Sequence, residues 1–408
     1  MDRRLMLKAA LGAAVTPAIG SAAWAAEPDH DVTFLNDFDE LWETLRDRYC
    51  FFSDKRTDWD RVRTFYRPLA RSAESDDAFA EILRRTLAEL YDPHTSLANP
   101  PAGSPRLPIS DLIADWRNEQ AVVTAIDEDS VASQVGLRLG DVILTVDDRP
   151  VAAAAHDLLP KCLSRPDQAA QAYALNSAVA GRRGQPRRYQ VATGSAAPRD
   201  LLLPIRQSAP KPNVEWRRLD DGFGYVAIRS FADEAVTESF DQALAEFRDA
   251  PGLIIDVRDN GGGDTAIARP IMGRFISKTK PYALMRRRQG RGLGDFWTET
   301  VEPRGPFTYI RPVVVLTNHW SGSMAEGFPM GMRGLGRATV VGTPMMGLGA
   351  AVFPITLDRT GVKAQYSAEP VYDVKGQPRW LMQPDVAVPE GEDILAAGRR
   401  VLATATAA

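Results

Sequence analysis

The sequence predicts an α/β fold built from three successive parts. Residues 32–91 carry apolar side chains at helical spacing, as at Leu41 and Leu45. Residues 108–206 contain short segments rich in β-branched residues, and residues 213–408 alternate apolar strand-like runs with helical stretches. A chain that begins with helices, continues with a small β-rich part and ends with alternating strands and helices is expected to form two or three domains.

Composition excludes some classes of function. The chain has 408 residues, is 44% apolar and has a net charge of -4, so it is long enough for a large core but lacks the basic excess that nucleic-acid binding requires. Cys50 and Cys162 lie in different predicted parts and do not have the spacing of a metal site. We expect two buried thiols, with a disulfide as the alternative in an oxidising compartment. We expect no metal or cofactor.

Residues 1–26 are predicted to be a secretory signal of the twin-arginine type. Arg3 and Arg4 precede a short apolar stretch that ends in small residues. A membrane anchor is the alternative, but Pro17 and Gly20 interrupt a stretch that is already short for a bilayer. The expected mature protein is periplasmic or secreted, and has no stable membrane span.

The first two parts can be divided into expected elements. In residues 32–97, the third helical stretch is opened by Ser75 as a predicted N-terminal cap. The segment "ANPPAGSPRLP" (98–108) has the composition of a linker. Beyond it, "AVVTAI" (121–126) and "DVILTV" (141–146) are expected strands.

The third part contains strands that are apolar on both faces, which is typical of buried, largely parallel sheets. Two of them, "GLIIDV" (252–257) and "PVVVLT" (312–317), lead into turns rich in small residues. The first turn contains the triple glycine of "DVRDNGGG", whose N–H groups could face a developing negative charge. The second exposes the hydroxyl of Ser323 before a helix. The alternatives are an ordinary strand-to-helix turn and a serine, Ser321 or Ser323, that only caps the helix.

The segment "ASQVGLRLGDVILTVDDRPV" (132–151) resembles PDZ domains of the bacterial type, which bind a peptide C-terminus as an added strand. This resemblance implies a PDZ module over residues 106–206. Together with "DVRDNGGG" and "SGSMAE", it makes the chain similar to tail-specific (C-terminal processing) serine peptidases and to the related tricorn-type peptidase core, over about residues 34–390. The family implies a crotonase-like mixed-sheet peptidase core, expected over residues 213–395.

The resemblance also assigns expected roles. Ser323 matches the nucleophile, and the N–H of Met324 matches one donor of the oxyanion hole. The second donor is one of the three glycines at 261–263, for which Gly262 is our choice. Pro329 departs from the family and is expected to interrupt or kink the helix after Ser323.

The general base is where this sequence departs most from the family. The tail-specific branch uses a lysine, but that position is Leu348 here, and its partner glutamine falls at Val352. The tricorn-like branch uses a histidine, and His94 in "LYDPHTSL" (90–97) matches it. Pro93 replaces the serine that precedes this histidine in that branch.

Other partners for the base stay open. The late glutamate of the tricorn pattern would fall near Pro378, and Glu369 is the nearest acid of interest. Thr95 or Ser96 could orient the imidazole instead. His319, four residues before Ser323, is an alternative base without support from either family pattern.

The sequence therefore predicts an exported serine peptidase that captures protein or peptide substrates, by their C-terminus, in a PDZ groove. Ser323 and His94 would be catalytic, with Met324 and Gly262 in the oxyanion hole. The alternative is a catalytically impaired binding protein on a peptidase scaffold.

Overall fold

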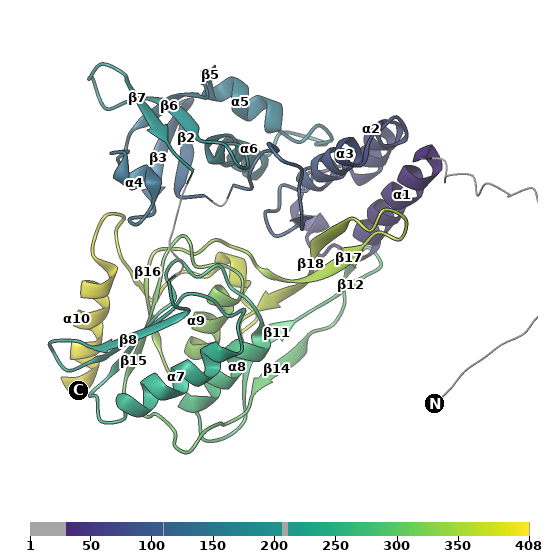
Figure 1. Ribbon diagram of the computed structural model, residues 1–408. Coiled ribbons are helices and arrows are strands. Elements are labelled where there is room, and N and C mark those ends of the chain that lie inside the picture. The colour runs from purple at the N-terminus through teal and green to yellow at the C-terminus, as the bar shows by residue number, and fades with distance from the viewer. Residues whose placement is uncertain (1–29, 109, 206–210, 408) are drawn as a thin grey trace, which may run out of the picture.

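The computed structural model describes residues 30–108, 110–205 and 211–407 of the chain. The predicted signal segment, residues 1–26, lies outside the described residues. Figure 1 shows helices α1–α3 on one side, a small β-rich unit next to them and a larger α/β core below. Among the described residues, no helix is both long and apolar enough to cross a membrane.

Three helices form the N-terminal part: α1 (His30–Arg48), α2 (Trp59–Arg71) and α3 (Asp76–Ala88), with the short 3₁₀ helix η1 (Phe52–Asp54) between the first two. Ser75 caps α3, because its Oγ accepts the N–H of Ala78 at 3.2 Å, which confirms the predicted cap. The apolar core under these helices also includes side chains from residues 353–368. The N-terminal part is therefore packed on a segment that comes from the end of the chain.

The β-rich unit is an antiparallel sheet of strand order β2-β3-β4-β6-β7, with β5 paired to β4. Its strands are β2 (Leu112–Arg117), β3 (Gln120–Ile126), β4 (Val142–Val146), β5 (Arg149–Pro150), β6 (Arg187–Ala192) and β7 (Arg199–Leu203). Its helices are α4 (Val131–Gln134), α5 (Val151–Leu158) and α6 (Gln168–Ala180). Strand β2 is an edge strand, and α6 packs along it.

The core contains a six-stranded sheet of order β19-β16-β15-β10-β9-β8, in which only β8 is antiparallel to its neighbour. The strands are β8 (Val214–Arg218), β9 (Gly224–Ile228), β10 (Leu253–Asp256), β15 (Val313–Thr317), β16 (Thr339–Gly342) and β19 (Val386–Ala387). The expectation of buried, largely parallel strands is confirmed.

Helices cover both faces of this sheet. Helices α7 (Ala235–Glu246), α8 (Thr265–Met272) and α9 (Met324–Gly334) pack on one face, and α10 (Ile394–Ala407) packs on the other. Successive side chains of β10 point to opposite faces of the sheet. Ile255 packs in the apolar core beneath α7–α9, and Ile254 packs in the apolar core beneath α10. This alternation explains why the central strands are apolar at every position.

A second, five-stranded sheet joins the core to the N-terminal helices. It contains β1 (Ser96–Leu97), β11 (Lys280–Met285), β14 (Trp297–Val301), β17 (Ala350–Thr356) and β18 (Lys363–Tyr372). The small elements beside it are β12 (Arg288–Gln289), β13 (Gly292–Leu293), η2 (Gly273–Phe275) and η3 (Arg379–Leu381). Strand β1 pairs with β18, which places the segment around residue 94 next to the C-terminal hairpin.

Two details test the sequence expectations directly. Cys50 and Cys162 are buried free thiols, as expected. Helix α9 continues through Pro329, so the expected interruption is wrong. Proline has no N–H to donate at position 329, and core packing stabilises the helix there, since Phe328 and Met330 are buried.

Candidate active site

The site forms where two parallel strands end at the same edge of the core sheet, where ligands bind in many α/β proteins. Strand β10 leads into residues 257–264 and β15 into residues 318–323. The two loops are bonded to each other: the Gly322 N–H donates to the Asn260 carbonyl at 2.9 Å, and the Asn318 amide donates to Asp259 Oδ1 at 2.7 Å. The glycine loop and the serine loop therefore form one rigid unit.

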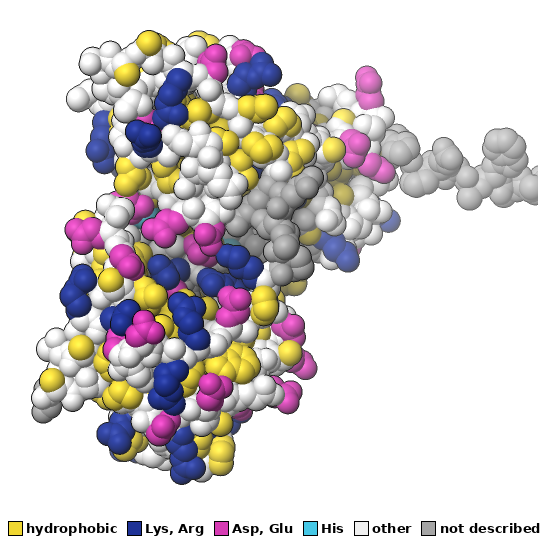
Figure 2. Space-filling view, turned by 60° about the vertical axis from the view of Figure 1, so that its left-hand side comes forward, with side chains coloured by type: hydrophobic (Ala, Val, Ile, Leu, Met, Phe, Trp, Pro, Cys, Tyr) yellow, Lys and Arg dark blue, Asp and Glu magenta, His cyan; other side chains and the backbone are white. Residues whose placement is uncertain are grey.

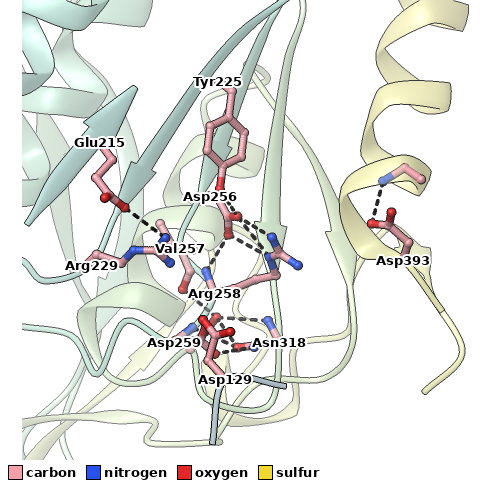
Figure 3. Close-up of polar contacts among 12 residues, drawn as sticks. Asp129, Glu215, Tyr225, Arg229, Asp256, Val257, Arg258, Asp259, Asn318 and Asp393 are labelled. Atoms are coloured by element: carbon pink, nitrogen blue, oxygen red, sulfur yellow. Dashed lines mark hydrogen bonds and ion pairs between the residues drawn. The ribbon is translucent and has the colours of Figure 1, made fainter. Parts of the chain in front are cut away.

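The buried carboxylate of Asp256 anchors the start of the glycine loop (Figure 3). The carboxylate of Asp256 is fully buried at the end of β10. It accepts a hydrogen bond from the Tyr225 hydroxyl at 2.7 Å and from Arg258 Nη2 at 2.7 Å. Because the carboxylate is paired with a guanidinium and is hydrogen-bonded, its burial is compensated, and it fixes the start of the glycine loop.

Ser323 has an unusual backbone conformation at the start of α9. Its φ is +53° and its ψ is -114°, a region that side chains rarely adopt. Such a conformation costs about 1–3 kcal/mol and persists only where the surrounding structure imposes it, often at functional sites. The sharp turn predicted after β15 is therefore present, and Ser323 is at its strained position.

Gly262 lies directly against this turn. A Cβ added at Gly262 would be 2.7 Å from the Ser323 Cβ and 2.9 Å from the Met324 nitrogen. Only glycine fits at that distance, and the φ of +105° also requires it. The structure thus brings together Ser323, Met324 and Gly262. The Met324 N–H belongs to the first turn of α9, where N–H groups have no partner within the helix.

The Gly262 N–H itself differs from the expectation. It donates to Asn260 Oδ1 at 2.8 Å, so an oxyanion would have to compete with that amide oxygen. Gly262 contributes close approach rather than a free donor. The adjacent Gly263 lines the pocket beside Ser323.

A pocket of about 390 Å³ opens next to the serine. About half of its wall is apolar, and its one cationic side chain among the described residues is Arg379. The residues that line it are Gly263, Asp264, Thr265, Tyr282, Met285, Ser323, Met324, Gly327, Met330, Ala350, Ala351, Val352, Val371 and Arg379. The size and the apolar part of the wall suit a side chain of a bound polypeptide.

Leu348, the residue expected at the position of the family lysine, lies next to the serine turn. A Cβ added at Gly322, the residue before the serine, would be 3.3 Å from Leu348 Cδ1. The Leu348 side chain is buried, at 7% exposure. The position is therefore next to the nucleophile turn, and it holds a side chain that cannot accept a proton.

Glu326 and Arg379 form a buried charged pair beside Ser323. Glu326 Oε1 accepts the N–H of Ser323 at 3.2 Å and the N–H of Leu348 at 2.7 Å. Glu326 Oε2 lies 3.7 Å from Arg379 Nε. Burial raises the pKa of Glu326 to about 7, although the nearby Arg379 and the N–H donors oppose that rise. Burial also lowers the pKa of Arg379, opposed by Glu326, but a guanidinium stays protonated at neutral pH.

Sequence reasoning gave these two residues no role. Glu326 has a local signal, because a Ser-x-x-Glu pattern at the start of a helix predicts a carboxylate that reaches back to the serine N–H. Arg379 has none. It lies on η3 and reaches the site only through the tertiary fold.

His94 lies in a tight turn before β1. Its backbone N–H donates to Asp92 Oδ1 at 3.0 Å, and its carbonyl accepts from Gln365 Nε2 at 3.1 Å. Burial lowers the pKa of the imidazole to about 4, with Asp92 opposing and Arg379 adding to the effect. The ring is therefore neutral at pH 7.

The imidazole is not bonded to the serine in this structure. Within the described ranges, Nδ1 of His94 is buried and has no hydrogen-bond partner. No hydrogen bond joins the ring to Ser323 among these residues. Arg379, which lines the pocket beside Ser323, is close enough to His94 to lower its pKa. Arg379 therefore lies near both Ser323 and His94.

The other candidate partners are engaged elsewhere. Thr95 Oγ1 donates to Asp92 Oδ2 at 2.9 Å, and Glu369 is paired with Arg287. His319 Nε2 lies 3.1 Å from Glu390 Oε2, in a separate cavity between the core and the β-rich unit. Among the described residues, no cluster of His, Cys, Asp and Glu is arranged to hold a metal ion.

A parallel core sheet with a strained serine at a strand-turn-helix bend, packed against a glycine loop, is the arrangement of a serine hydrolase core. Comparison with known families agrees: residues 222–388 match peptidase family S41, and residues 31–88 match the Tricorn protease C1 domain. Residues 222–388 are thus similar to peptidase family S41, whose members are serine-type peptidases, which are hydrolases.

Two curated relatives support this assignment. The carboxy-terminal processing protease CtpB of Bacillus subtilis is 34% identical over 128 residues, 31% of this chain and 25% of that protein. The chloroplastic C-terminal processing peptidase of Tetradesmus obliquus is 25% identical over 353 residues, 80% of this chain and 71% of that protein. The chain thus matches about a quarter of the length of the first relative.

Solved structures share the fold. Mature CPAF complexed with lactacystin is similar with a TM-score of 0.61 and 16% identity, over 92% of this chain and 98% of that one. The photosystem II D1 C-terminal processing protease has a TM-score of 0.56 and 20% identity, over 93% of this chain and 98% of that one. At such identities the likeness concerns the fold alone, a mixed α/β core with N-terminal helices.

Proposed function

We propose that this protein is an exported serine peptidase with Ser323 as the nucleophile. The observation that carries the proposal is the strained turn at Ser323, packed against Gly262. Strain of this kind persists where a function requires it. Ser323 lines a pocket of about 390 Å³ and lies at the positive end of α9.

In this mechanism Ser323 Oγ attacks the scissile carbonyl, and the imidazole of His94 accepts its proton. The Met324 N–H stabilises the oxyanion, and the second donor comes from the glycine loop, where Gly263 lines the pocket and Gly262 must first release Asn260. The protonated imidazole then protonates the leaving amine. Water hydrolyses the acyl-enzyme by the same route in reverse.

His94 must move to act as the base. A base needs to lie within about 2.6–3.2 Å of the hydroxyl, and such contacts often tighten only when substrate is bound. The unpaired, buried Nδ1 of His94 supports this role, because a buried nitrogen without a partner is costly in the free protein.

We also propose that the β-rich unit acts as a PDZ module that captures a polypeptide C-terminus along β2. That edge is engaged in the free protein, since Asn176 of α6 accepts the Ala114 N–H at 3.0 Å and donates to the Ala114 carbonyl at 2.9 Å. Strand addition requires the same two groups. Capture therefore requires α6 to release β2.

The second candidate function is peptide binding without turnover. The observation that favours it is the serine site itself: Leu348 replaces the lysine, and His94 is not bonded to Ser323 in the described part of the chain. A scaffold of this kind would hold a polypeptide in the same pocket and release it intact.

Hydrolysis of unstructured polypeptides, followed by mass spectrometry, separates the two. We compare the parent protein with Ser323→Ala and His94→Ala, and with His156→Ala as a control at an exposed histidine of α5. The peptidase proposal expects cleavage by the parent and by His156→Ala, and a loss of at least about 100-fold in the other two. Binding with no cleavage by the parent would establish the second function.

A further inference from the structure

The pocket beside Ser323 has one cationic side chain in its wall among the described residues, the guanidinium of Arg379. The residue is 6% exposed. Its Nη2 donates to the carbonyl groups of Leu348 at 2.5 Å and Ala350 at 3.3 Å. These bonds hold the guanidinium plane against β17, so its position in the pocket is fixed.

The remaining donor groups of Arg379, Nε and Nη1, make no hydrogen bond within the described residues. Nε is buried and has no hydrogen-bond partner, and neither has Glu326 Oε2, 3.7 Å away. Nη1 lies against Gly327, where an added Cβ would be 3.2 Å from it. Gly327 lines the same pocket. A buried guanidinium with unused donors is costly, and an acceptor brought by a ligand removes that cost.

The charge balance around the pocket favours an anionic acceptor. Glu326, the nearest carboxyl group, is held by the N–H groups of Ser323 and Leu348, and burial raises its pKa. Asp264 also lines the pocket, but its Oδ1 caps α8 by accepting the Ala266 N–H at 2.8 Å. The N-terminus of α9 adds partial positive charge at Met324.

The other walls suit an aliphatic stem. Met285, Met330, Val352 and Val371 line the same pocket as Ser323 and Arg379. A group that fills this pocket would pack methylene groups against these side chains and direct an anionic oxygen group, such as a carboxylate, toward Arg379.

We propose that Arg379 determines specificity by binding a carboxylate of the polypeptide substrate in the pocket beside Ser323. The inference deepens the proposed peptidase function and rests on the same pocket. Two sources supply such a carboxylate: an acidic side chain next to the scissile bond, or the free C-terminus of the chain.

Binding to the Ser323→Ala protein tests the proposal without any need for turnover. Fluorescent peptides carry Glu, Gln or Leu at one internal position, each with a free or an amidated C-terminus, and fluorescence anisotropy gives the affinities. If the side chain is recognised, Glu peptides bind about 10–100-fold more tightly than Gln peptides at both kinds of terminus. If the C-terminus is recognised, amidation lowers the affinity of all the peptides by a similar factor. Equal affinity across all six peptides would overturn the proposal.

Variants then locate the effect. Arg379→Met keeps the aliphatic stem and removes the donors, so it should abolish the preference for a carboxylate, whereas Arg379→Lys should retain part of it. Gly327→Ala, whose Cβ would press on Nη1, should weaken the preference while leaving the charge. Circular dichroism checks folding. If Arg379→Met does not fold, the six-peptide series and Arg379→Lys still decide.

The test separates this proposal from the peptidase function. A protein that prefers carboxylate peptides but never cleaves them keeps the role of Arg379 and loses the peptidase. A protein that cleaves polypeptides but has no carboxylate preference, or one whose preference is unchanged in Arg379→Met, keeps the peptidase and contradicts the role of Arg379.

Discussion

At the scale of single residues, the serine is surrounded by an unusual set of charges. Arg379 contributes a buried positive charge, Glu326 a carboxyl group with a pKa of about 7, and position 348 contributes only leucine. A guanidinium cannot take the proton of a serine at neutral pH. The positive charge near Ser323 therefore suits recognition, and proton transfer needs another group.

A substitution at position 348 tests directly whether the absent lysine limits the reactivity of Ser323. Leu348→Lys would place an amine beside the turn at Gly322, and burial near Arg379 would lower the pKa of that amine. We expect Ser323 to react with a fluorophosphonate at least about 10-fold faster than in the parent at pH 8–9. Leu348→Met is the matched control. A folded Leu348→Lys protein that reacts no faster than the control would show that the absence of a lysine at position 348 does not limit the reactivity of Ser323.

His94 makes a prediction about stability and pH. Its pKa is about 4 in the folded protein against an ordinary 6.5, so the unfolded chain binds more protons between these values. Stability is therefore fully present above about pH 6.5 and is lost as the pH falls towards 4. Between pH 7 and pH 4 the parent should lose about 3 kcal/mol of unfolding free energy relative to His94→Gln.

Urea unfolding at several pH values measures this difference. Glu326 titrates in both proteins, so its contribution cancels in the comparison. The control is His156→Gln, which replaces an exposed histidine and should follow the parent. A constant difference between parent and His94→Gln across this range would contradict the buried, neutral imidazole.

At the scale of elements, the edge of β2 is closed by a single side chain. Asn176 makes the two hydrogen bonds to Ala114 that an added strand would make, and its Nδ2 also donates to the Ala172 carbonyl at 2.9 Å. Asn176→Ala should cost about 1–3 kcal/mol of stability, because both groups of Ala114 lose their partner. It should also raise the affinity for peptides with a free C-terminus.

Hydrogen exchange and peptide titration check this expectation. Ala114 should exchange faster in Asn176→Ala. Ser177→Ala is the matched control on the same helix, since the Ser177 Oγ is buried without a partner in the described structure and its loss should change little. Peptide affinity that is unchanged in Asn176→Ala would place substrate capture away from β2.

Elements also explain which structural features could be predicted from the sequence. The central strands were predictable because burial on both faces leaves a continuous apolar run, and the cap at Ser75 because it is a local hydrogen bond. The predicted interruption of α9 at Pro329 was wrong, since core packing stabilises the helix across this residue. Arg379 and Asn176 were missed, because their roles depend on segments that only the tertiary fold brings together.

At the scale of the whole molecule, the β-rich unit and the core meet beside the serine loop. A cavity of about 140 Å³ lies between them, lined by residues 127–129 of the unit and by Arg229, Arg258 and His319 of the core. Figure 2 shows acidic side chains along this boundary, with arginine and lysine side chains of the core below them. Trp320, three residues before Ser323, donates its indole N–H to the Ser110 carbonyl at the start of β2.

This contact should hold the unit in place. Trp320→Phe keeps the ring and removes the donor, so we expect looser seating of the unit, seen as a larger radius of gyration in small-angle X-ray scattering and faster exchange near residues 110–112. Trp297→Phe is the control, because the Trp297 N–H bonds Glu299 on the same strand of the core. Identical scattering and exchange for the two variants would mean that other contacts seat the unit.

The central claim is that Ser323 is a reactive nucleophile, and covalent labelling tests it most directly. The parent protein and Ser323→Ala are incubated with a fluorophosphonate, and intact-mass and peptide mass spectrometry locate the adduct. Our account predicts one adduct per parent chain, on Ser323, and none on the variant. An unlabelled parent, or equal labelling of parent and variant, would contradict it.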